Sequence, residues 1–185
     1  DGTTTFRNCV FLGNGSNETG GAVYISATSA LFDSCYFHDN VAEQGGAVYV
    51  SDSRENRIDF VNCTFWQNRA TLYGGAVYVN QGIPRFTNCT ISDNLADQRG
   101  GAFYNQDEGA SPVIRSCIVW GNAASGDTET DQLFNGEGAQ VQILYSVVQG
   151  RADGLHATGV INADPGLAPP ADNGGAVPTM ATGDG

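Results

Sequence analysis

The residues best suited to chemistry in this sequence are five cysteines. A thiolate can attack an electrophile, bind a soft metal or form a disulfide, but an odd number of thiols cannot all pair within one chain. The sequence has no CxxC pair and no ligand cluster of the zinc type. The intervals between the cysteines are instead regular, at 26, 28, 26 and 28 residues, for Cys9, Cys35, Cys63, Cys89 and Cys117. This regularity favours a structural role over metal binding or redox chemistry.

Four tyrosines recur with a similar period and could form a ligand-stacking face for sugar rings. They are Tyr24, Tyr49, Tyr78 and Tyr104, and each ends a Gly-Gly-Ala-Val-Tyr or Gly-Gly-Ala-Phe-Tyr phrase. Strict alternation along a strand places Val23 and Tyr24 on opposite faces. Two arrangements follow: an external tyrosine stripe over inward valines, or tyrosines packed inside or against loops. We favour the second.

Two alternating phrases position these residues. The first surrounds each cysteine, as in Phe6-Arg-Asn-Cys9-Val-Phe11, and its sixth copy has Ser146 in the cysteine position. The second is the glycine phrase, with a degenerate fifth copy at Asp131-Gln-Leu-Phe-Asn135. Both recur with one period, so a single repeat contains both, and such periods indicate a repeat architecture.

The repeat predicts strands rather than helices. Its apolar runs are short, rich in Val, Ile, Phe and Tyr, and broken by Gly, Asn and Asp, whereas a helix needs apolar residues at i, i+3, i+4 and i+7. Leucine-rich repeats need a leucine frame, and a propeller blade needs four strands and a longer unit. We therefore predict an all-β fold, a right-handed parallel β-helix of about six coils with 26–29 residues per coil. Residues 1–158 should form the coils, residues 159–185 an irregular C-terminal tail or capping segment, and residues 123–138 a surface loop.

Equivalent residues of successive coils should stack about 4.8 Å apart. The phenylalanines then form interior columns, and the thiols form an inward column between them. A structural asparagine ladder is predicted as well, because Asn tolerates left-handed backbone at turns and stacked amides can hydrogen-bond. Its members are Asn14, Asn40, Asn68, Asn94 and Asn122, with Arg151 in that place in the sixth copy. The Gly-Gly pairs should supply positive φ or close backbone approach, and no lysine follows them as in a phosphate loop.

The charge balance limits the partners. Twenty acidic residues oppose eight basic ones, all of them arginine, for a net charge of −12. This charge argues against nucleic acid and anionic membranes. The apolar runs are too short for membrane insertion by this segment. An acidic surface suits an extracellular or cell-surface location, and we expect no cofactor, with calcium the one ion that the carboxylates could bind.

The two phrases also resemble a known family. Phe-x-x-Asn (Phe11 to Asn14, and its repeats) alternating with Gly-Gly-Ala-Val is similar to the FxxN and GGAI repeats of chlamydial polymorphic outer-membrane proteins, which are surface-exposed adhesin passengers. More widely, residues 1–150 resemble secreted bacterial right-handed β-helix repeat proteins. The tail, from Asp164-Pro-Gly-Leu167 to Asp172-Asn-Gly-Gly-Ala-Val-Pro-Thr179, is similar to the closing segment of bacterial surface proteins with a variable anchor. None of these families implies a defined catalytic set.

We therefore expect a non-catalytic, structural or adhesin-type module of a bacterial surface or secreted protein. Its partners would be a host or cell-surface protein or glycan, or a second copy that stacks end to end on open strand edges into fibres. The alternative is a carbohydrate-active β-helix, polysaccharide lyase or glycosidase-like, or a sugar-binding module, because enzymes share this fold. The outward positions show no acidic pair on adjacent coils, and His38 and His156 fall in unrelated contexts.

Overall fold

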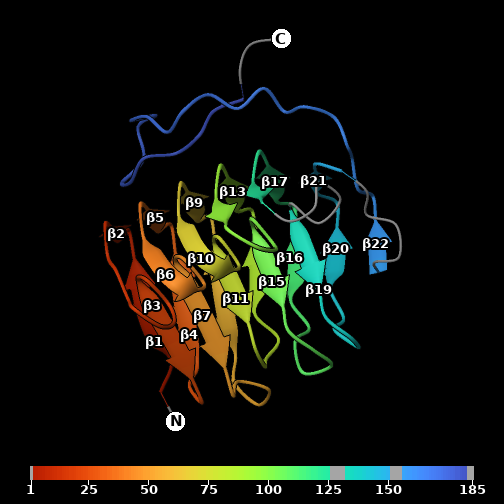
Figure 1. Ribbon diagram of the computed structural model, residues 1–185. Coiled ribbons are helices and arrows are strands. Elements are labelled where there is room, and N and C mark those ends of the chain that lie inside the picture. The colour runs from red at the N-terminus through yellow and green to blue at the C-terminus, as the bar shows by residue number, and fades with distance from the viewer. Residues whose placement is uncertain (1, 126–131, 151–155, 183–185) are drawn as a thin grey trace.

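Short parallel strands, stacked coil upon coil, form the body of the protein (Figure 1). The computed structural model describes residues 2–125, 132–150 and 156–182. Every strand pairs in parallel with the equivalent strand of a neighbouring coil, and no helix capable of crossing a membrane occurs in these ranges. The predicted all-β parallel β-helix is confirmed.

The chain passes through four sheets in each coil, which we name A to D. Sheet A contains β1 (Thr4–Arg7), β4 (Ala30–Asp33), β8 (Ile58–Val61), β12 (Arg85–Thr87), β16 (Val113–Arg115), β20 (Gln142–Leu144) and β22 (His156–Thr158). Sheet B contains β2 (Val10–Leu12), β5 (Tyr36–His38), β9 (Thr64–Trp66), β13 (Thr90–Ser92), β17 (Ile118–Trp120) and β21 (Val147–Val148). Sheet C contains β6 (Val41–Gln44), β10 (Arg69–Tyr73), β14 (Leu95–Ala96) and β18 (Ala123–Ala124). Sheet D contains β3 (Val23–Ser26), β7 (Val48–Ser51), β11 (Val77–Val79), β15 (Phe103–Asn105) and β19 (Leu133–Asn135).

The number of complete coils is about five rather than the six predicted. Sheet D has five strands, one for each glycine phrase, the degenerate copy forming β19. The sixth cysteine-type phrase forms β20 and β21, but no glycine phrase follows it, so the chain returns directly to sheet A at β22. Arg151 lies outside the described residues. The predicted surface loop over residues 123–138 is also wrong in part, because it contains β18 and β19.

Two columns of phenylalanine fill the interior where sheets A and B meet. Successive rings stack at centroid distances of 4.9 Å for Phe6 and Phe32 and 4.6 Å for Phe11 and Phe37. Rings of the two columns meet edge to face, as Phe32 and Phe37 do at 5.8 Å. Burying one such side chain contributes roughly 1.5–3 kcal/mol. The fully buried rings of the two columns are Phe32, Phe37, Phe60, Phe65 and Phe86, and Phe103 of sheet D packs edge to face against Phe86.

The asparagine ladder lies inside the turn between sheets B and C. The Asn68 side chain accepts hydrogen bonds from the Asn40 backbone N–H at 3.1 Å and from its Nδ2 at 2.8 Å. Asn68 in turn donates to Asn94 Oδ1 and to the Phe37 carbonyl oxygen. The Asn68 side chain therefore satisfies two backbone groups of the preceding coil, the Asn40 N–H and the Phe37 carbonyl, which explains how a polar residue is tolerated at full burial.

The left-handed residue at this turn lies one position before the ladder asparagine, not on it. The residues with positive φ there are Gly13, Asp39, Gln67, Asp93 and Gly121. A second left-handed column precedes the cysteine position, with φ between 50° and 55° at Asn8, Ser34, Asn62, Asn88, Ser116 and Tyr145. Asparagine thus has two separate roles. Asn8, Asn62 and Asn88 adopt the left-handed conformation before the cysteine, and the ladder asparagines supply side-chain hydrogen bonds.

The Gly-Gly pairs combine both predicted roles, one for each glycine. Gly45 has a φ of 67°, which disfavours any residue with a Cβ atom. A Cβ atom on Gly46 would overlap the carbonyl oxygen of Gly75 on the next coil and would lie 2.6 Å from the Arg69 backbone. The second glycine is therefore required by the close approach of successive coils.

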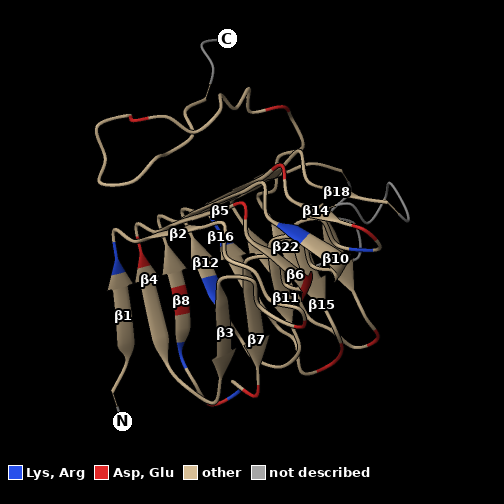
Figure 2. Ribbon diagram, turned by 60° about the vertical axis from the view of Figure 1, so that its left-hand side comes forward, with Lys and Arg blue, Asp and Glu red and all other residues tan. Residues whose placement is uncertain are grey.

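The C-terminal segment folds back along the side of the coils. Coil pairing continues to Ile161, whose N–H donates to Ser146 O at 2.9 Å, past the predicted boundary at residue 158. Residues 163–166, the hinge, then lead into residues 167–182, the strap, which crosses the outer face of sheet B in both ribbon views (Figures 1 and 2). The strap pairs with itself through antiparallel bridges, including Ala171 with Thr179.

The outward side chains of sheet B are buried, as expected if the strap covers this face. Tyr36, Thr64 and Ser92 point outward, because their neighbours Phe37, Phe65 and Ile91 point inward, yet their exposed fractions are 5%, 4% and 2%. On sheet A, whose outer face has no such cover, the outward side chains remain partly or fully exposed. The tail thus covers one side of the helix.

Replacing a central ladder residue tests the role of this hydrogen-bond network. Asn68→Leu should lower the free energy of unfolding by about 2–4 kcal/mol, because Asn40, Asn94 and the Phe37 carbonyl would lose buried partners. Urea unfolding followed by circular dichroism measures it. Asn14→Leu is the matched control: Asn14 is exposed at the ladder end, and we expect a cost below about 1 kcal/mol. Equal costs would contradict a buried network.

Candidate ligand-binding face

The tyrosine column lies on the outer side of sheet D. Val48 and Val77 are fully buried inside the coil, so the tyrosines that follow them point outward. The rings nevertheless stack on one another, at 5.4 Å for Tyr24 and Tyr49 and 4.9 Å for Tyr49 and Tyr78. The arrangement therefore combines the two alternatives from the sequence: an external column whose members are mostly buried by each other.

Stacking leaves few ring faces free. Tyr49 and Tyr78 are 9% and 4% exposed, and Tyr104 is followed in the column by Phe134 at 4.9 Å. Burial, reinforced by neighbouring tyrosines, raises the pKa of Tyr78, whose hydroxyl donates to Gln106 Oε1. Only Tyr24, at 55% exposed, keeps an open face, at the N-terminal end. A sugar needs a free ring face for stacking, so this column offers one position rather than a stripe.

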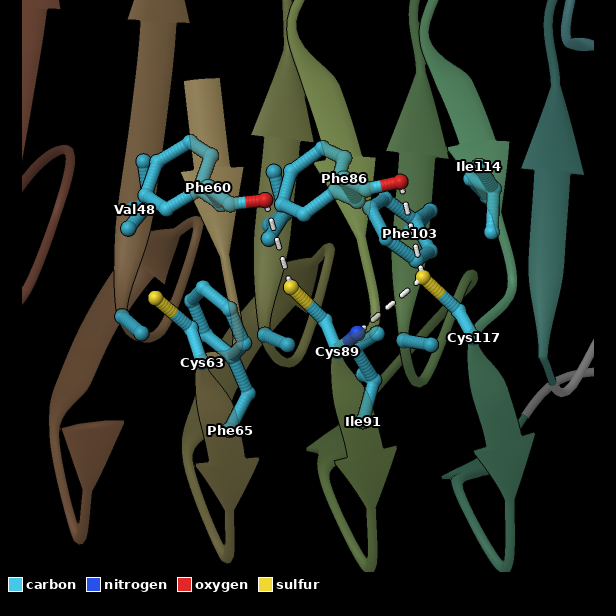
Figure 3. Packing of buried hydrophobic residues seen from close by; sticks show 14 of the residues in the cluster. Val48, Phe60, Cys63, Phe65, Phe86, Cys89, Ile91, Phe103, Ile114 and Cys117 are labelled. Atoms are coloured by element: carbon cyan, nitrogen blue, oxygen red, sulfur yellow. Dashed lines mark hydrogen bonds between the residues drawn. The ribbon is translucent and has the colours of Figure 1, made fainter. Parts of the chain in front are cut away.

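The thiol column is enclosed by backbone. All five thiols are free, and four are buried, with Cys9 half-exposed at the first coil. Figure 3 shows Cys89 and Cys117 pointing into the phenylalanine core, each Sγ donating to a carbonyl of the preceding coil. Burial raises the pKa of Cys89 well above its ordinary value. Ser146 keeps the pattern by accepting from the Cys117 N–H at 3.1 Å.

The ladder has a different ending at each terminus of the coils. Asn14 Oδ1 receives no hydrogen bond from any residue that the structure describes. At the other end, Asn122 Nδ2 donates to Gln132 Oε1 at 2.7 Å, and Gln132 Nε2 returns a bond to Asn122 O at 2.8 Å. Gln132 therefore closes the ladder, a role that the sequence did not indicate because it falls in the degenerate fifth copy.

The outer face of sheet A gathers the positive charge of this acidic chain. Figure 2 shows basic and acidic positions interspersed along the ribbon of this sheet. Five of the eight arginines lie on it or on the loop that leads to it: Arg7, Arg54, Arg57, Arg85 and Arg115. Two of them are paired, Arg7 with Asp33 at 3.4 Å and Arg57 with Asp59. Arg54 and Arg85 form no ion pair with a described residue.

Two adjoining hollows lie between these arginines. The larger, of about 500 Å³, is lined by Thr3, Thr5, Leu31, Arg57, Asp59, Val61, Arg85 and Thr87. The smaller, of about 370 Å³, is lined by Arg54, Glu55, Asn56, Arg57, Ile83 and Arg85. Arg57 and Arg85 belong to both, so the hollows form one groove with three arginines against two carboxylates. We call it the sheet A groove.

The groove has the chemistry of an anion-binding site. Guanidinium groups bind carboxylate and sulfate through paired N–H donors, and threonine hydroxyls can bond to sugar hydroxyls. The sequence analysis did not identify this groove, because its residues are far apart along the chain. The column before each Phe contains Leu31, Asp59 and Arg85, and the same alternation would have identified it.

The remaining candidate side chains are dispersed or engaged elsewhere. His38 lies on sheet B, where its ring stacks on Trp66 at 4.6 Å and its Nε2 is 3.1 Å from Asp39 Oδ2. Asp93 accepts a hydrogen bond from Trp66 Nε1 at 3.0 Å. His156 is on sheet A, beside Gln140. Within residues 2–125, 132–150 and 156–182, no group of three or more His, Cys, Asp or Glu is placed to hold a metal ion.

Comparison with known proteins gives a family and one distant relative. The family described as the right handed beta helix region matches residues 1–159. The chain is also similar to the metabotropic glutamate receptor-like protein P of Dictyostelium discoideum, with 36% identity over 76 residues. That match covers 40% of this chain and 5% of the Dictyostelium protein, so the chain corresponds to a small part of it. No solved structure matches the chain.

The thiol column predicts a graded reactivity. In the native protein, Ellman's reagent should modify at most one thiol per chain, because only Cys9 has access to solvent. Cys9→Ser should abolish this native reaction, while the other four thiols react only in denaturant. Absorbance at 412 nm counts the modified groups. Modification of several thiols under native conditions would mean that the core column is open.

Proposed function

This chain belongs to the right-handed β-helix family, and on that premise we propose that it is a non-catalytic, adhesin-type module of a bacterial secreted or cell-surface protein. The single observation that carries the proposal is the sheet A groove, where the cations of a chain with a net charge of −12 gather on a solvent-facing surface. The resemblance of the repeats to chlamydial adhesin passengers supports it. The repeated Phe, Cys and Asn side chains serve the interior, which leaves the outward, variable positions for recognition.

The ligand that suits this groove is a glycan bearing carboxylate or sulfate groups. Arg54 and Arg85 are exposed and lack a carboxylate partner in the described residues, so an anionic ligand would not have to displace one. Thr5 and Thr87 lie in the same groove and offer hydroxyls to sugar oxygens. The groove runs across several coils, because its lining comes from β1, β4, β8 and β12. An extended chain could therefore lie across the strands.

Removing the two unpaired arginines tests this assignment. Arg54→Ser combined with Arg85→Ser should weaken binding to heparin or polygalacturonate about tenfold, since two exposed charge contacts of about 0.7 kcal/mol each sum to about 1.4 kcal/mol. Calorimetry at two salt concentrations measures affinity, and neutral dextran should not bind.

Arg69→Ser is the matched control, because Arg69 is an exposed arginine on sheet C that pairs with Asp97. Its loss should leave glycan affinity within about twofold of the parent. Equal losses for the control and for the groove variant would show unspecific charge attraction and refute the site.

A carbohydrate-active enzyme is the second candidate. The specific observation in its favour is the position of Asp59 beside Arg57 and Arg85 in the groove, which places an acid and two cations together. Incubation with polygalacturonate, with and without calcium, distinguishes the two functions. New reducing ends, or absorbance near 235 nm from an unsaturated product, would establish turnover and overturn the non-catalytic proposal.

End-to-end assembly of copies is a third candidate function, because coils that pair in parallel register within one chain can also pair between copies. The Gln132 closure of the ladder must open for a second copy to join in register. Electron microscopy should then show filaments for Gln132→Ala more readily than for the parent; short rods for both would refute assembly.

A further inference from the structure

The strap lies over sheet B and is hydrogen-bonded only to itself among the described residues (Figure 1). Every hydrogen bond given for residues 167–182 joins two strap residues, such as Ala168 N to Ala181 O at 2.9 Å and Asn173 Nδ2 to Thr179 O at 2.8 Å. No described strap residue hydrogen-bonds to the coils. The strap is therefore a small hairpin with its own internal pairing, which can leave the coils without breaking backbone ladders.

The contact surface of the strap is apolar. Val177 is 7% exposed, and Leu167, Pro178 and Met180 are partly buried. Sheet B, over which the strap runs in Figure 1, carries the outward residues Tyr36, His38, Trp66, Ile118 and Trp120, which we call the aromatic face. Burial raises the pKa of Tyr36 to about 12, and the negative charge of Asp39 adds a smaller increase. This increase is expected for a tyrosine ring that is covered. Hydrophobic contact is thus the main attraction between strap and coils.

A short hinge connects the two parts. Ile161 still pairs with the coils, and Asn162 accepts a hydrogen bond from Gly150 N at 3.2 Å. The chain then turns at Asp164-Pro-Gly166, where Gly166 has a φ of 59° and its N–H donates to Asp164 Oδ1 at 2.8 Å. This turn directs the strap back over its own coils. If the turn is opened, the same strap points away from them.

We propose that the aromatic face of sheet B is an interface for a second copy of this chain, which delivers its own strap to it. Two copies that exchange straps make the same contacts between strap and coils as one closed copy, in a two-fold symmetric dimer. The balance between the closed monomer and the exchanged dimer then depends on the hinge and on concentration. The inference is independent of the sheet A groove, which lies on another sheet.

Shortening the hinge tests the exchange. Deleting residues 164–166 removes the turn, so the strap can no longer reach its own coils but can still reach those of a partner. Light scattering after gel filtration should give twice the 19.4 kDa mass of the parent, with tryptophan emission unchanged because Trp66 and Trp120 stay covered. A monomer, whether its tryptophans are covered or exposed, would overturn the proposal.

A docking-deficient strap is the matched control. Val177→Asp with Met180→Asp, introduced into the hinge-shortened chain, should restore the monomer and shift tryptophan emission to longer wavelength. A dimer that persists in this variant does not depend on the strap and would overturn the proposal.

The parent chain gives a second measurement that is independent of any variant's folding. Two differently labelled samples, mixed at millimolar concentration and then diluted, should show energy transfer that decays slowly. The parent chain carrying Val177→Asp and Met180→Asp should show no energy transfer, because its straps cannot dock on a partner. No energy transfer in the parent at millimolar concentration would likewise refute exchange.

Discussion

The hydrogen bond that each ladder asparagine makes to the backbone of the adjacent coil fixes the register of the whole molecule. A shift of one residue would turn every inward side chain outward, so the pairing of parallel strands tolerates one alignment only. The ladder selects that alignment at the tight turn between sheets B and C, where both Asn40 N–H and Nδ2 reach Asn68 Oδ1. With this register in place, Phe stacks on Phe, thiol on thiol and tyrosine on tyrosine. The second glycine of each pair allows the successive coils to come this close.

A fixed register divides the residues into two populations. Inward columns must repeat, because each side chain packs against its own equivalents above and below. Outward columns are free to vary, and in this chain the variation concentrates arginine on sheet A and aromatic residues on sheet B. The first surface remains open and the second is covered by the strap. The two functions that we propose, ligand recognition and contact between copies, therefore use different sides of one rod.

The two ends of the coils are chemically different. At the N-terminal end the ladder presents an acceptor, the Phe6 and Phe11 rings are partly exposed, and Tyr24, Val10 and Leu12 are more than half exposed. At the other end, Gln132 closes the ladder and Arg99 lies over the Phe134 ring at 4.7 Å. The strap extends from this closed end and protects the side of sheet B. Each ladder Oδ1 accepts hydrogen bonds from the asparagine of the coil before it. The two ends differ because the first asparagine in the ladder has no such donor among the described residues.

The sequence by itself determined the coil and its interior. The recurrence of Phe, Cys, Asn and Gly-Gly at one period predicts strands in parallel register, because each residue then stacks on its equivalents about 4.8 Å away. It also indicated a structural role for the ladder, although it placed the left-handed residue one position too late. Tertiary structure decided the rest. Arg54 and Arg85 are separated by more than a full repeat, and only the stacking of coils brings them to one groove. The tyrosines were ambiguous because alternation assigns opposite faces without saying which is inside. The strap contains no periodic signal, and its place on sheet B depends on apolar contacts with residues far away in the chain, which no local pattern encodes.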